Sequence, residues 1–361
     1  MSIPKKGSVT FFAFIDEGTA NIGRKVEDYC EGLRAQGYQA EPALIKVDGF
    51  LNRINRGRDI AGSQFDILIL RNSIYTPFLF LFLIGARLKG RKLIIEMPTP
   101  LRVMVYEVWR SDRGFLPKLL LIIMLYLFFP ISLWPAHRIL NYSNESFYFS
   151  IGLKKKSRLI TNGIHTDRIP VRSYSQKGQK APVTLIGVAM FQPSHGYERM
   201  IRSIQNYLED HSIEDRREVK LILVGDGELR KEWEELVEKL SLTDRVEFTG
   251  VKTGKELDEI FEQADIAVGK LAPYKINLQI ASELKLRGYC ARGIPFIKSY
   301  EDPDFPEGLE FVYSVENSSA LIDIDKVLQW YDELDHQYLT DRIRHYAETH
   351  LDYKKKELLY L

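Results

Sequence analysis

Short apolar runs alternate with amphipathic segments along most of the 361-residue chain. This alternation is typical of βαβ units wound around a parallel sheet. Apolar residues at helical spacing predict a helix from Asn21 to Gln36, and Gly37 follows it in a C-cap position. In the first half of the chain, the apolar runs predict strands at Val9–Ile15, Ile67–Leu70, Lys92–Glu96 and Arg138–Tyr142.

A polar stretch, SYSQKGQKAP at 173–182, carries Gly and Pro without large aliphatic residues and predicts a linker. After it the alternation begins again. It predicts strands at Val183–Val188, Val219–Val224, Val246–Thr249, Ile266–Val268 and Pro295–Ile297. Helices are predicted between them at 197–208, 228–240, 255–263 and 282–292. We therefore expect two α/β domains, each built around its own parallel sheet.

Two stretches depart from the pattern, because 77–84 (PFLFLFLI) and 119–134 (LLLIIMLYLFFPISLW) are apolar almost all round. The second contains Pro130 and is shorter than the roughly 20 residues that span a bilayer. Residues suited to a membrane interface lie nearby: Lys89, Trp109, Lys118 and Trp134. Three interpretations stay open, namely buried helices on the first sheet, peripheral docking on a membrane where a lipid-linked acceptor would live, and a spanning helix.

Composition and charge limit the kinds of function that the protein can have. Hydrophobic residues make up 45% and charged residues 27%, as in globular proteins. A formal net charge of +1 argues against a nucleic-acid partner. Two cysteines, Cys30 and Cys290, indicate a reducing compartment, and Asp16 and Glu17 break the first apolar run too early for a signal peptide. We expect a cytoplasmic protein.

The segment 185–201, LIGVAMFQPSHGYERMI, reads as a strand, a loop and the start of a helix. Such loops bind anions, because free N–H groups and the helix dipole converge there. Gly187 and Gly196 would let the backbone approach a ligand, while His195 and Arg199 supply donors. A purely structural turn is the alternative.

Four further pieces form a recognisable pattern. They are NGI at 162–164, the GDG-containing block at 221–251 with FTG at its end, HGYERMI at 195–201, and ADIAVGKLAPYKINLQIASELKLRGYCARGIPFI at 264–297. With them the chain resembles retaining glycosyltransferases of the GT-B fold, of the glycosyltransferase family 4 type, from bacterial polysaccharide pathways. The resemblance covers roughly 155–300 well and the first 150 residues only in layout.

The resemblance implies two Rossmann-like domains facing a central cleft, at 1–165 and 166–337, with a C-terminal helix (338–361) that returns to the first. It implies transfer of a sugar from a nucleotide-sugar donor to a saccharide or lipid-linked acceptor, without a cofactor. An acceptor-free sugar-nucleotide epimerase is an alternative. The acceptor would meet the first domain, where Glu96 and the Asp16–Thr19 loop end strands; a polar strand terminus explains Glu96 equally well.

In such enzymes the nucleotide lies on the second domain, with its base near the loop after the FTG strand. Lys275 and Lys285 are the candidates for stabilising the diphosphate, and solvated surface charge is the competing interpretation for each. The loop 272–277 would offer backbone N–H groups. The donor-binding positions are then Gly187, His195, Gly196, Arg199, Gly250, Val251, Asn277, Leu284 and Gly288.

One departure weakens the resemblance. The family carries a glutamate, which grips the ribose, where this chain has Gly288, and its earlier glutamate falls on Ile280. Glu283 is a poor substitute, because five helical residues would turn it about 140° away from position 288. The alternative function is therefore a catalytically weakened binding subunit. No metal is expected, since the Asp323-Ile324-Asp325 motif precedes an amphipathic helix and suits a cap.

Overall fold

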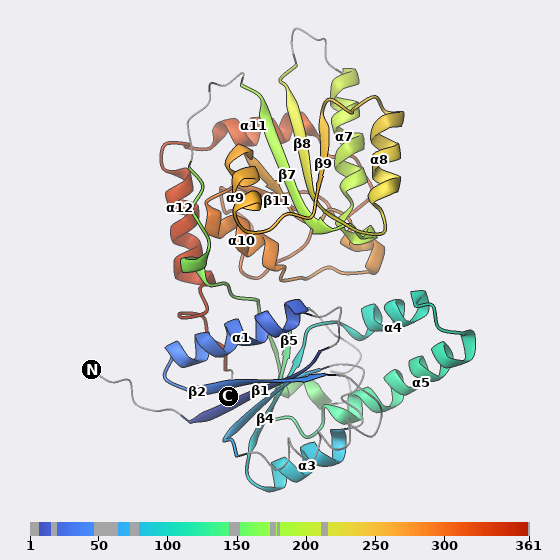
Figure 1. Ribbon diagram of the computed structural model, residues 1–361, viewed down its shortest axis with the longest axis vertical. Coiled ribbons are helices and arrows are strands. Elements are labelled where there is room, and N and C mark those ends of the chain that lie inside the picture. Colours follow the sequence, from blue (N-terminus) through green and yellow to red (C-terminus); the bar gives the residue numbers. More distant parts are fainter. Residues whose placement is uncertain are drawn as a thin grey trace. The chain divides into compact units, whose positions relative to one another are not determined.

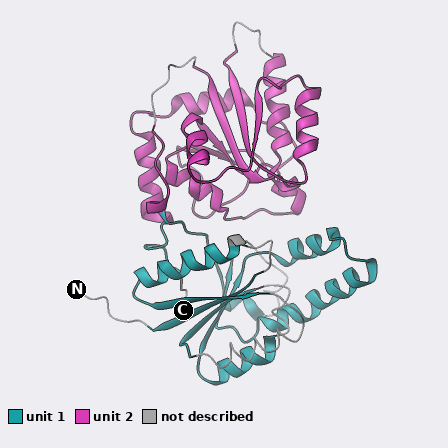
Figure 2. Cartoon of the chain, viewed as in Figure 1, with its two compact units in different colours: residues 1–165, 352–361 teal, residues 166–351 magenta. Residues whose placement is uncertain are grey.

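The computed structural model describes residues 7–15, 20–46, 64–72, 79–143, 152–173, 178, 181–210 and 216–359. The chain divides into two compact units, which Figure 2 shows in different colours. The first unit comprises residues 1–165 and 352–361, and the second comprises 166–351. The chain therefore passes from one unit to the other twice, once after His165 and once after Leu351.

The first unit contains a six-stranded parallel sheet in the order β2-β1-β3-β4-β5-β6. Its strands are β1 (Ser8–Ile15), β2 (Gln39–Lys46), β3 (Ile67–Arg71), β4 (Lys92–Met97), β5 (Arg138–Asn141) and β6 (Ser157–Leu159). The four predicted strands are all present. Successive strands lie on opposite sides of β1, so the sheet has its topological switch point between β1 and β3.

Helices cover both faces of this sheet (Figure 1). They are α1 (Ala20–Ala35), α3 (Phe80–Leu88), α4 (Leu101–Arg110) and α5 (Phe115–Ser132). Side chains of β1 alternate between the two faces. Phe11 packs in the core under α1, whereas Phe12 packs in the core formed with α3, α4 and α5. Hydrophobic burial on both faces is what a parallel sheet requires.

The second unit repeats this plan with the order β12-β11-β10-β7-β8-β9. Its strands are β7 (Val183–Met190), β8 (Val219–Asp226), β9 (Val246–Gly250), β10 (Ile266–Val268), β11 (Phe296–Lys298) and β12 (Val312–Ser314). Its helices are α7 (Tyr197–Asp210), α8 (Arg230–Lys239), α9 (Gly254–Gln263), α10 (Leu284–Arg292), α11 (Ile324–Glu333) and α12 (Leu339–Tyr346). The switch point of this sheet lies between β7 and β10.

The C-terminal segment differs from the prediction. Helix α12 and the π-helical turn 347–351 belong to the second unit, where Leu339 and Ile343 are buried and α12 packs against α10. Arg344 fixes this packing by donating to the carbonyl of Ala291 (2.7 Å). Only residues 352–361 return to the first unit, and there Gln36 donates to the carbonyl of Tyr353 (3.0 Å). A return beginning at 338 is therefore wrong, because the apolar side of α12 is already covered.

Candidate functional site

Two loops meet at the switch point of the second sheet. One follows β7 and contains the 3₁₀ turn η5 (Pro193–His195), and the other follows β10 and contains η6 (Pro273–Ile276). The N–H of Leu271 donates to the carbonyl of His195 (2.9 Å). Gly196 has φ of 64°, and a Cβ there would lie 2.5 Å from the Cβ of Ala272. Contact between the loops, rather than approach of a ligand, is therefore what requires glycine at this position.

Two other predicted donor residues also turn out to hold the fold. A Cβ at Gly187 would lie 2.7 Å from the Tyr197 ring, so the glycine makes room for that side chain. Arg199 is buried, and its guanidinium donates to the carbonyls of Leu271 (2.9 Å), Glu316 (2.9 Å) and Ala320. Three backbone carbonyls therefore engage Nε and Nη1 of Arg199, and a donor-binding role for this residue stays a prediction.

Backbone N–H groups of the 272–277 loop are likewise engaged in hydrogen bonds within the protein. The N–H of Tyr274 donates to the side chain of Asn317 (2.9 Å), and those of Lys275 and Asn277 donate to carbonyls within the turn. Lys275 is exposed and forms an ion pair with Glu198. Asn277 is exposed and takes the left-handed conformation that ends the turn, with φ of 51°. The N–H groups of residues 274, 275 and 277 are therefore unavailable as the predicted cradle.

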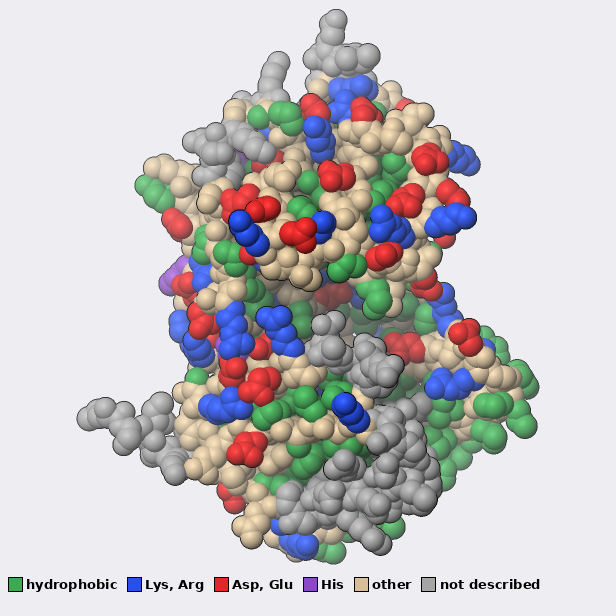
Figure 3. Space-filling view, in the orientation of Figure 1, with side chains coloured by type: hydrophobic (Ala, Val, Ile, Leu, Met, Phe, Trp, Pro, Cys, Tyr) green, Lys and Arg blue, Asp and Glu red, His purple; other side chains and the backbone are tan. Residues whose placement is uncertain are grey.

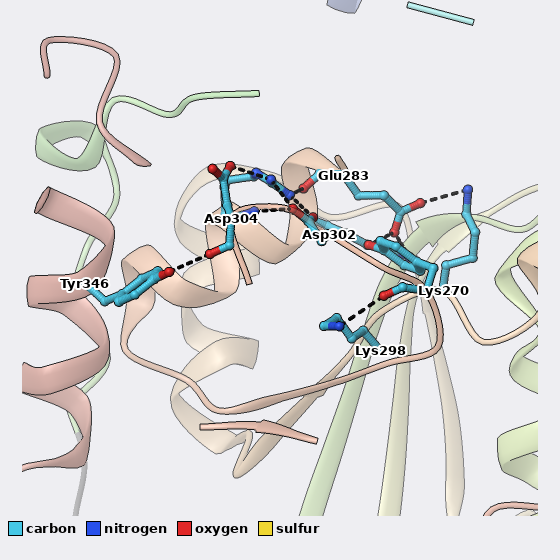
Figure 4. A network of polar contacts seen from close by, with 9 residues as sticks. Lys270, Glu283, Lys298, Asp302, Asp304 and Tyr346 are labelled. Atoms are coloured by element: carbon cyan, nitrogen blue, oxygen red, sulfur yellow. Dashed lines mark hydrogen bonds and ion pairs between the residues drawn. The ribbon is translucent and has the colours of Figure 1, made fainter. Parts of the chain in front are cut away.

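Lys285 lies in a compact charged cluster around Glu283, the N-cap residue of α10. Lys270 approaches the Glu283 carboxylate to 2.8 Å and Lys285 to 3.8 Å, and the Tyr300 hydroxyl donates to it (3.0 Å). Figure 4 shows Lys270 and Glu283 pointing toward one another. The Nζ of Lys285 also lies 3.4 Å from the Tyr197 hydroxyl. We call Lys270, Glu283, Lys285 and Tyr300 the lysine cluster.

The charges in the lysine cluster are strongly coupled. Burial alone would raise the pKa of Glu283, but the Lys270 and Lys285 cations together lower it by more. The pKa of Glu283 therefore falls far below its usual range. Burial, together with Lys270, lowers the pKa of Lys285 to about 8 against the opposing effect of Glu283. The cluster therefore holds two lysines against one carboxylate, with Lys285 still mostly protonated at neutral pH.

The charges of the lysine cluster also shift the pKa of His195. Burial, and then the Lys285 cation, lower the pKa of His195 to about 2, so its imidazole is neutral. Its Nδ1 is buried and has no hydrogen-bond partner among the residues that the structure describes. His195 is thus a neutral polar group beside the lysine cluster, with one ring nitrogen still to be satisfied.

A pocket of about 580 Å³ opens at the carboxyl ends of β7, β8 and β9. Its apolar wall includes Met190 and Val251, which are 63% and 68% exposed. Its other lining residues are Val188, Ala189, Val224, Gly225, Asp226, Gly227 and Lys252. We call it the second-unit pocket. It contains the predicted Val251, whereas Gly250, with φ of 73°, supplies the turn before it.

Gly288 lies inside α10, and a Cβ there would meet nothing within 4 Å. The neighbouring Arg287 is fully buried and donates to the carboxylates of Asp302 (2.6 Å) and Asp304 (2.6 Å), which Figure 4 labels. Arg287 thus anchors the helix, whereas packing does not demand a glycine at 288. Leu284, at the first turn of α10, is 46% exposed.

In the first unit, the candidate Glu96 is almost fully buried in an ion cluster. Its carboxylate lies 2.6 Å from Arg71 and 3.5 Å from Lys25, and it accepts a hydrogen bond from the Tyr142 hydroxyl (2.6 Å). Burial alone would raise the pKa of Glu96, but Arg71 and Lys25 lower it to about 2. The carboxylate is held by these three groups, which argues against the predicted contact with an acceptor hydroxyl.

Arg71 also lines a second pocket, of about 320 Å³, at the switch point of the first sheet. Asn72 lines the same pocket. Its side-chain oxygen and nitrogen are both buried and have no hydrogen-bond partner among the described residues. The lining residues are Phe14, Ile22, Arg71, Asn72, Pro98, Thr99, Met104, Glu107, Val108, Arg113 and Leu125. We call it the first-unit pocket. The predicted Asp16–Thr19 loop lies outside the described residues.

Two features bear on metal binding. Asp323 caps α11 by accepting from the N–H of Lys326 (3.1 Å), as predicted. Ligand atoms of Asp28, Glu31 and His165 lie within 4.8 Å of one another, a grouping that the sequence did not reveal because His165 is far along the chain from the other two. The His165 Nε2 lies at hydrogen-bond distance (2.9 Å) from the carbonyl of Asp28, which accounts for this histidine without an ion.

Sequence reasoning missed several residues that the fold brings into these sites. Lys270 is the second residue after β10 and Asn72 directly follows β3, and the carboxyl ends of parallel strands are where ligands bind. That rule would have found both. Glu283 was judged by its angle on a helix, but α10 begins only at Leu284, so Glu283 precedes the helix with φ of −85° and ψ of 133°. Tyr300 gave no local signal.

Residues 173–271 match the family described as Glycosyl transferases group 1. Solved structures share the fold over nearly the whole chain. HepE from Anabaena in complex with UDP is 11% identical and covers 96% of both chains, with a TM-score of 0.63. Sucrose-phosphate synthase from Thermosynechococcus elongatus is 14% identical and covers 97% of this chain and 96% of its own, with a TM-score of 0.64.

The catalytic domain of starch synthase IV from Arabidopsis thaliana, bound to ADP and acarbose, is 10% identical and covers 96% of both chains, with a TM-score of 0.62. None of the curated proteins matches the sequence significantly. The predicted fold of two Rossmann-like domains is confirmed, and so is the resemblance to GT-B glycosyltransferases, in fold over the chain and in sequence over 173–271. Glycosyl transfer is the activity that these findings indicate.

Proposed function

We propose that the protein is a retaining glycosyltransferase of polysaccharide biosynthesis. It transfers a sugar from a nucleotide-sugar donor, held by the second unit, to a saccharide or lipid-linked acceptor. The observation that carries this proposal is the lysine cluster, in which two lysines face one carboxylate beside the switch point of a parallel sheet. Crevices at switch points are where open α/β sheets bind their ligands.

The cluster suits a departing nucleoside diphosphate, which gains negative charge as the bond to the sugar breaks. Preorganised cations in a partly desolvated site lower the energy of such a transition state. Lys285 is the better candidate for this role than Lys275. It is 13% exposed and lies 3.8 Å from its carboxylate partner, so that one of its N–H groups can turn to a phosphate oxygen. Lys275 is already paired with Glu198 at the surface.

The second-unit pocket suits the nucleoside. Met190 and Val251 expose apolar side chains on which a flat base can lie, and Asp226 supplies a carboxylate that accepts hydrogen bonds. The relatives described with UDP and with ADP support a nucleotide as the ligand. Gly288 leaves open space for a ribose but offers it no side-chain acceptor.

The α4–α5 hairpin, residues 101–134, supports contact with the inner face of the plasma membrane. Helix α5 is long and apolar enough to cross a membrane by length and composition, yet Leu125 and Phe129 are fully buried in the core of the first unit. Because one side of α5 is held in that core and only the other side is exposed, the helix suits a position along the membrane surface better than one across the membrane. Its exposed side chains are Phe115, Leu116, Leu119, Leu120, Ile123, Tyr126, Leu127, Phe128 and Ile131.

A donor screen tests the proposed function. The purified protein is incubated with UDP-, GDP-, ADP- and dTDP-sugars, and release of the nucleoside diphosphate is measured together with the shift in melting temperature. We expect one nucleotide class both to stabilise the protein and to be turned over, because a ligand that binds the native state raises apparent stability. Absence of binding and turnover with every donor would overturn the proposal.

A further inference from the structure

We propose that the first-unit pocket binds the phosphate headgroup of a membrane lipid, whose hydrocarbon chain lies against the α4–α5 hairpin. This inference rests on the proposed function, because it assigns the chemical class of the acceptor. It concerns only residues of the first unit, so its test is independent of the donor. Three observations carry it: the polar groups inside the pocket, the position of its wall, and the charge of the hairpin.

The pocket is a built polar site. Arg71 lines it and is fixed from behind by the Glu96 carboxylate (2.6 Å), so the guanidinium is held in place before a ligand arrives. Asn72 lines it with both side-chain polar atoms buried and unpartnered among the described residues, an arrangement that costs free energy unless a ligand supplies partners. Arg113 adds a second cation at the lining. A phosphate accepts hydrogen bonds from all three donors.

One acidic residue, Glu107, also lines the pocket. Burial raises the pKa of its carboxyl group, so the group takes up a proton more readily than usual and repels an anion less. With Arg71 and Arg113 opposite one carboxyl group, the charge of the lining is positive. An anionic headgroup matches that charge.

The wall of the pocket is the inner side of the hairpin. Met104 and Val108 of α4 and Leu125 of α5 line the pocket, while the other side of α5 is exposed and apolar. Figure 3 shows hydrophobic side chains gathered over this hairpin. The pocket wall and the apolar surface therefore belong to the same hairpin, and Arg113 lies in its turn. A soluble saccharide would use the polar groups but leave the apolar surface unexplained.

The charge of the hairpin supports a phospholipid membrane as the source of the ligand. Residues 101–134 contain four basic and two acidic side chains, so the hairpin is positive although the whole chain is nearly neutral. Trp109 and Trp134, near its two ends, are 54% and 67% exposed. Tryptophans at such positions anchor proteins in the headgroup region, and basic residues are drawn to anionic lipids.

Vesicle flotation tests the inference with the full-length protein. The probes are vesicles of phosphatidylcholine alone, with phosphatidic acid, and with phosphatidylglycerol, whose phosphate is a diester. We expect binding to phosphatidylcholine through the hairpin and tighter binding when phosphatidic acid is present. Leu120→Glu should abolish binding to all vesicles, and Leu44→Glu, which changes another exposed leucine, on β2 of the same unit, should not.

Two pocket variants separate the headgroup from the membrane surface. Arg113→Ala should reduce the advantage of phosphatidic acid over phosphatidylglycerol about fivefold, the equivalent of the ~1 kcal/mol that one basic residue contributes near an anionic surface. Asn72→Leu should reduce it by a similar factor, since one hydrogen bond contributes about 1 kcal/mol. Both should retain binding to phosphatidylcholine. Arg113 is exposed, so its variant tests the pocket even if Asn72→Leu fails to fold.

The inference is overturned if wild-type protein binds no vesicles, or if both pocket variants keep the full preference for phosphatidic acid. Self-association through the hairpin without vesicle binding would also overturn it, since another copy would then cover the apolar surface. Nucleotide binding is measured on the same samples. If it persists while vesicle binding fails, the lipid inference falls and the proposed donor site stands.

Discussion

Each unit of this protein holds a glutamate at the carboxyl edge of its sheet, and in each case two cations and a tyrosine hydroxyl contact the carboxylate. Glu96 is 1% exposed, and its partners lie at 2.6–3.5 Å. Glu283 is 15% exposed, and its partners lie at 2.8–3.8 Å, with Lys285 the most distant. The groups are similar, but in the second unit one cation is only loosely engaged.

This difference separates an occupied carboxylate from a loosely held one. Around Glu96 both cations and the tyrosine hydroxyl are closely engaged in a desolvated core, so a ligand of this carboxylate would have to break existing contacts. Around Glu283 one of the two lysines, Lys285, lies 3.8 Å from the carboxylate, and His195 adds a polar atom without a partner among the described residues. A glutamate at a strand end therefore does not by itself indicate catalysis; what matters is whether its partners still have capacity for a ligand.

The largest expected effect is on stability. Glu96→Gln leaves Arg71 and Lys25 without their buried counter-charge, and we expect it to lower the free energy of unfolding of the first unit by about 3–5 kcal/mol. Glu283→Gln should cost less, because its cluster reaches solvent. Urea unfolding monitored by circular dichroism measures both. Glu27→Gln, which breaks an exposed pair with Arg34, is the control and should change stability by no more than about 0.5 kcal/mol. Equal losses of unfolding free energy in Glu96→Gln and Glu283→Gln would contradict the difference between the two clusters.

The next effect is on the transfer rate. Lys285→Met removes a cation that stabilises the leaving diphosphate, and we expect kcat to fall about 10²–10³-fold, as when one preorganised donor is lost from an active site. Lys275→Met is the matched control, since this exposed lysine is paired with Glu198, and its effect should stay below about tenfold. Steady-state kinetics with the accepted donor distinguish them. A larger loss at 275 than at 285 would reverse the roles assigned here.

The pH dependence sharpens the assignment to Lys285. Because its pKa is lowered to about 8, its cation is present below that pH and is lost above it. The kcat/KM for the donor should therefore fall above about pH 8, by up to about tenfold per pH unit. Lys285→Arg should weaken this alkaline decline, since a guanidinium stays charged. An identical decline in the arginine variant would show that another group titrates.

The smallest effects concern Gly288, which bears on how the second unit holds its ligand. A Cβ there meets open space, so Gly288→Ala should stabilise α10 by up to about 1 kcal/mol. Gly288→Glu should in addition raise affinity for a nucleoside diphosphate without raising affinity for inorganic diphosphate, because only the former carries a ribose. Calorimetric titration measures both ligands. If the two affinities change equally, position 288 does not face the ribose.

The fold was predictable because the core strands are short, apolar and evenly spaced. Strand β10 was predicted to the residue, and β7 and β8 were each predicted two residues short of their ends. The missed strands were β2, β6 and β12. In β2, for example, Gln39, Glu41 and Lys46 are exposed beside buried Ala40 and Ile45, so the polar positions dilute the signal at the edge of the sheet.

The sites were less predictable, because they depend on which loops meet. Val251 lines the second-unit pocket and Lys285 lies in the lysine cluster, and their donor-binding roles stay predictions. Gly196 and Arg199 were singled out for a ligand, but the fold uses them to join the loops after β7 and β10. Those contacts span more than 70 residues of chain, and no local pattern reports them.

The proposed role of the second unit is to neutralise a nucleoside diphosphate through the lysine cluster. Calorimetric titration of UDP, GDP, ADP and dTDP into the wild-type protein and into Lys285→Met tests this role. We expect saturable binding of at least one nucleotide by the wild type and a loss of about tenfold or more in the variant. Unchanged affinity in Lys285→Met, or no binding of any of the four nucleotides to the wild type, would contradict it.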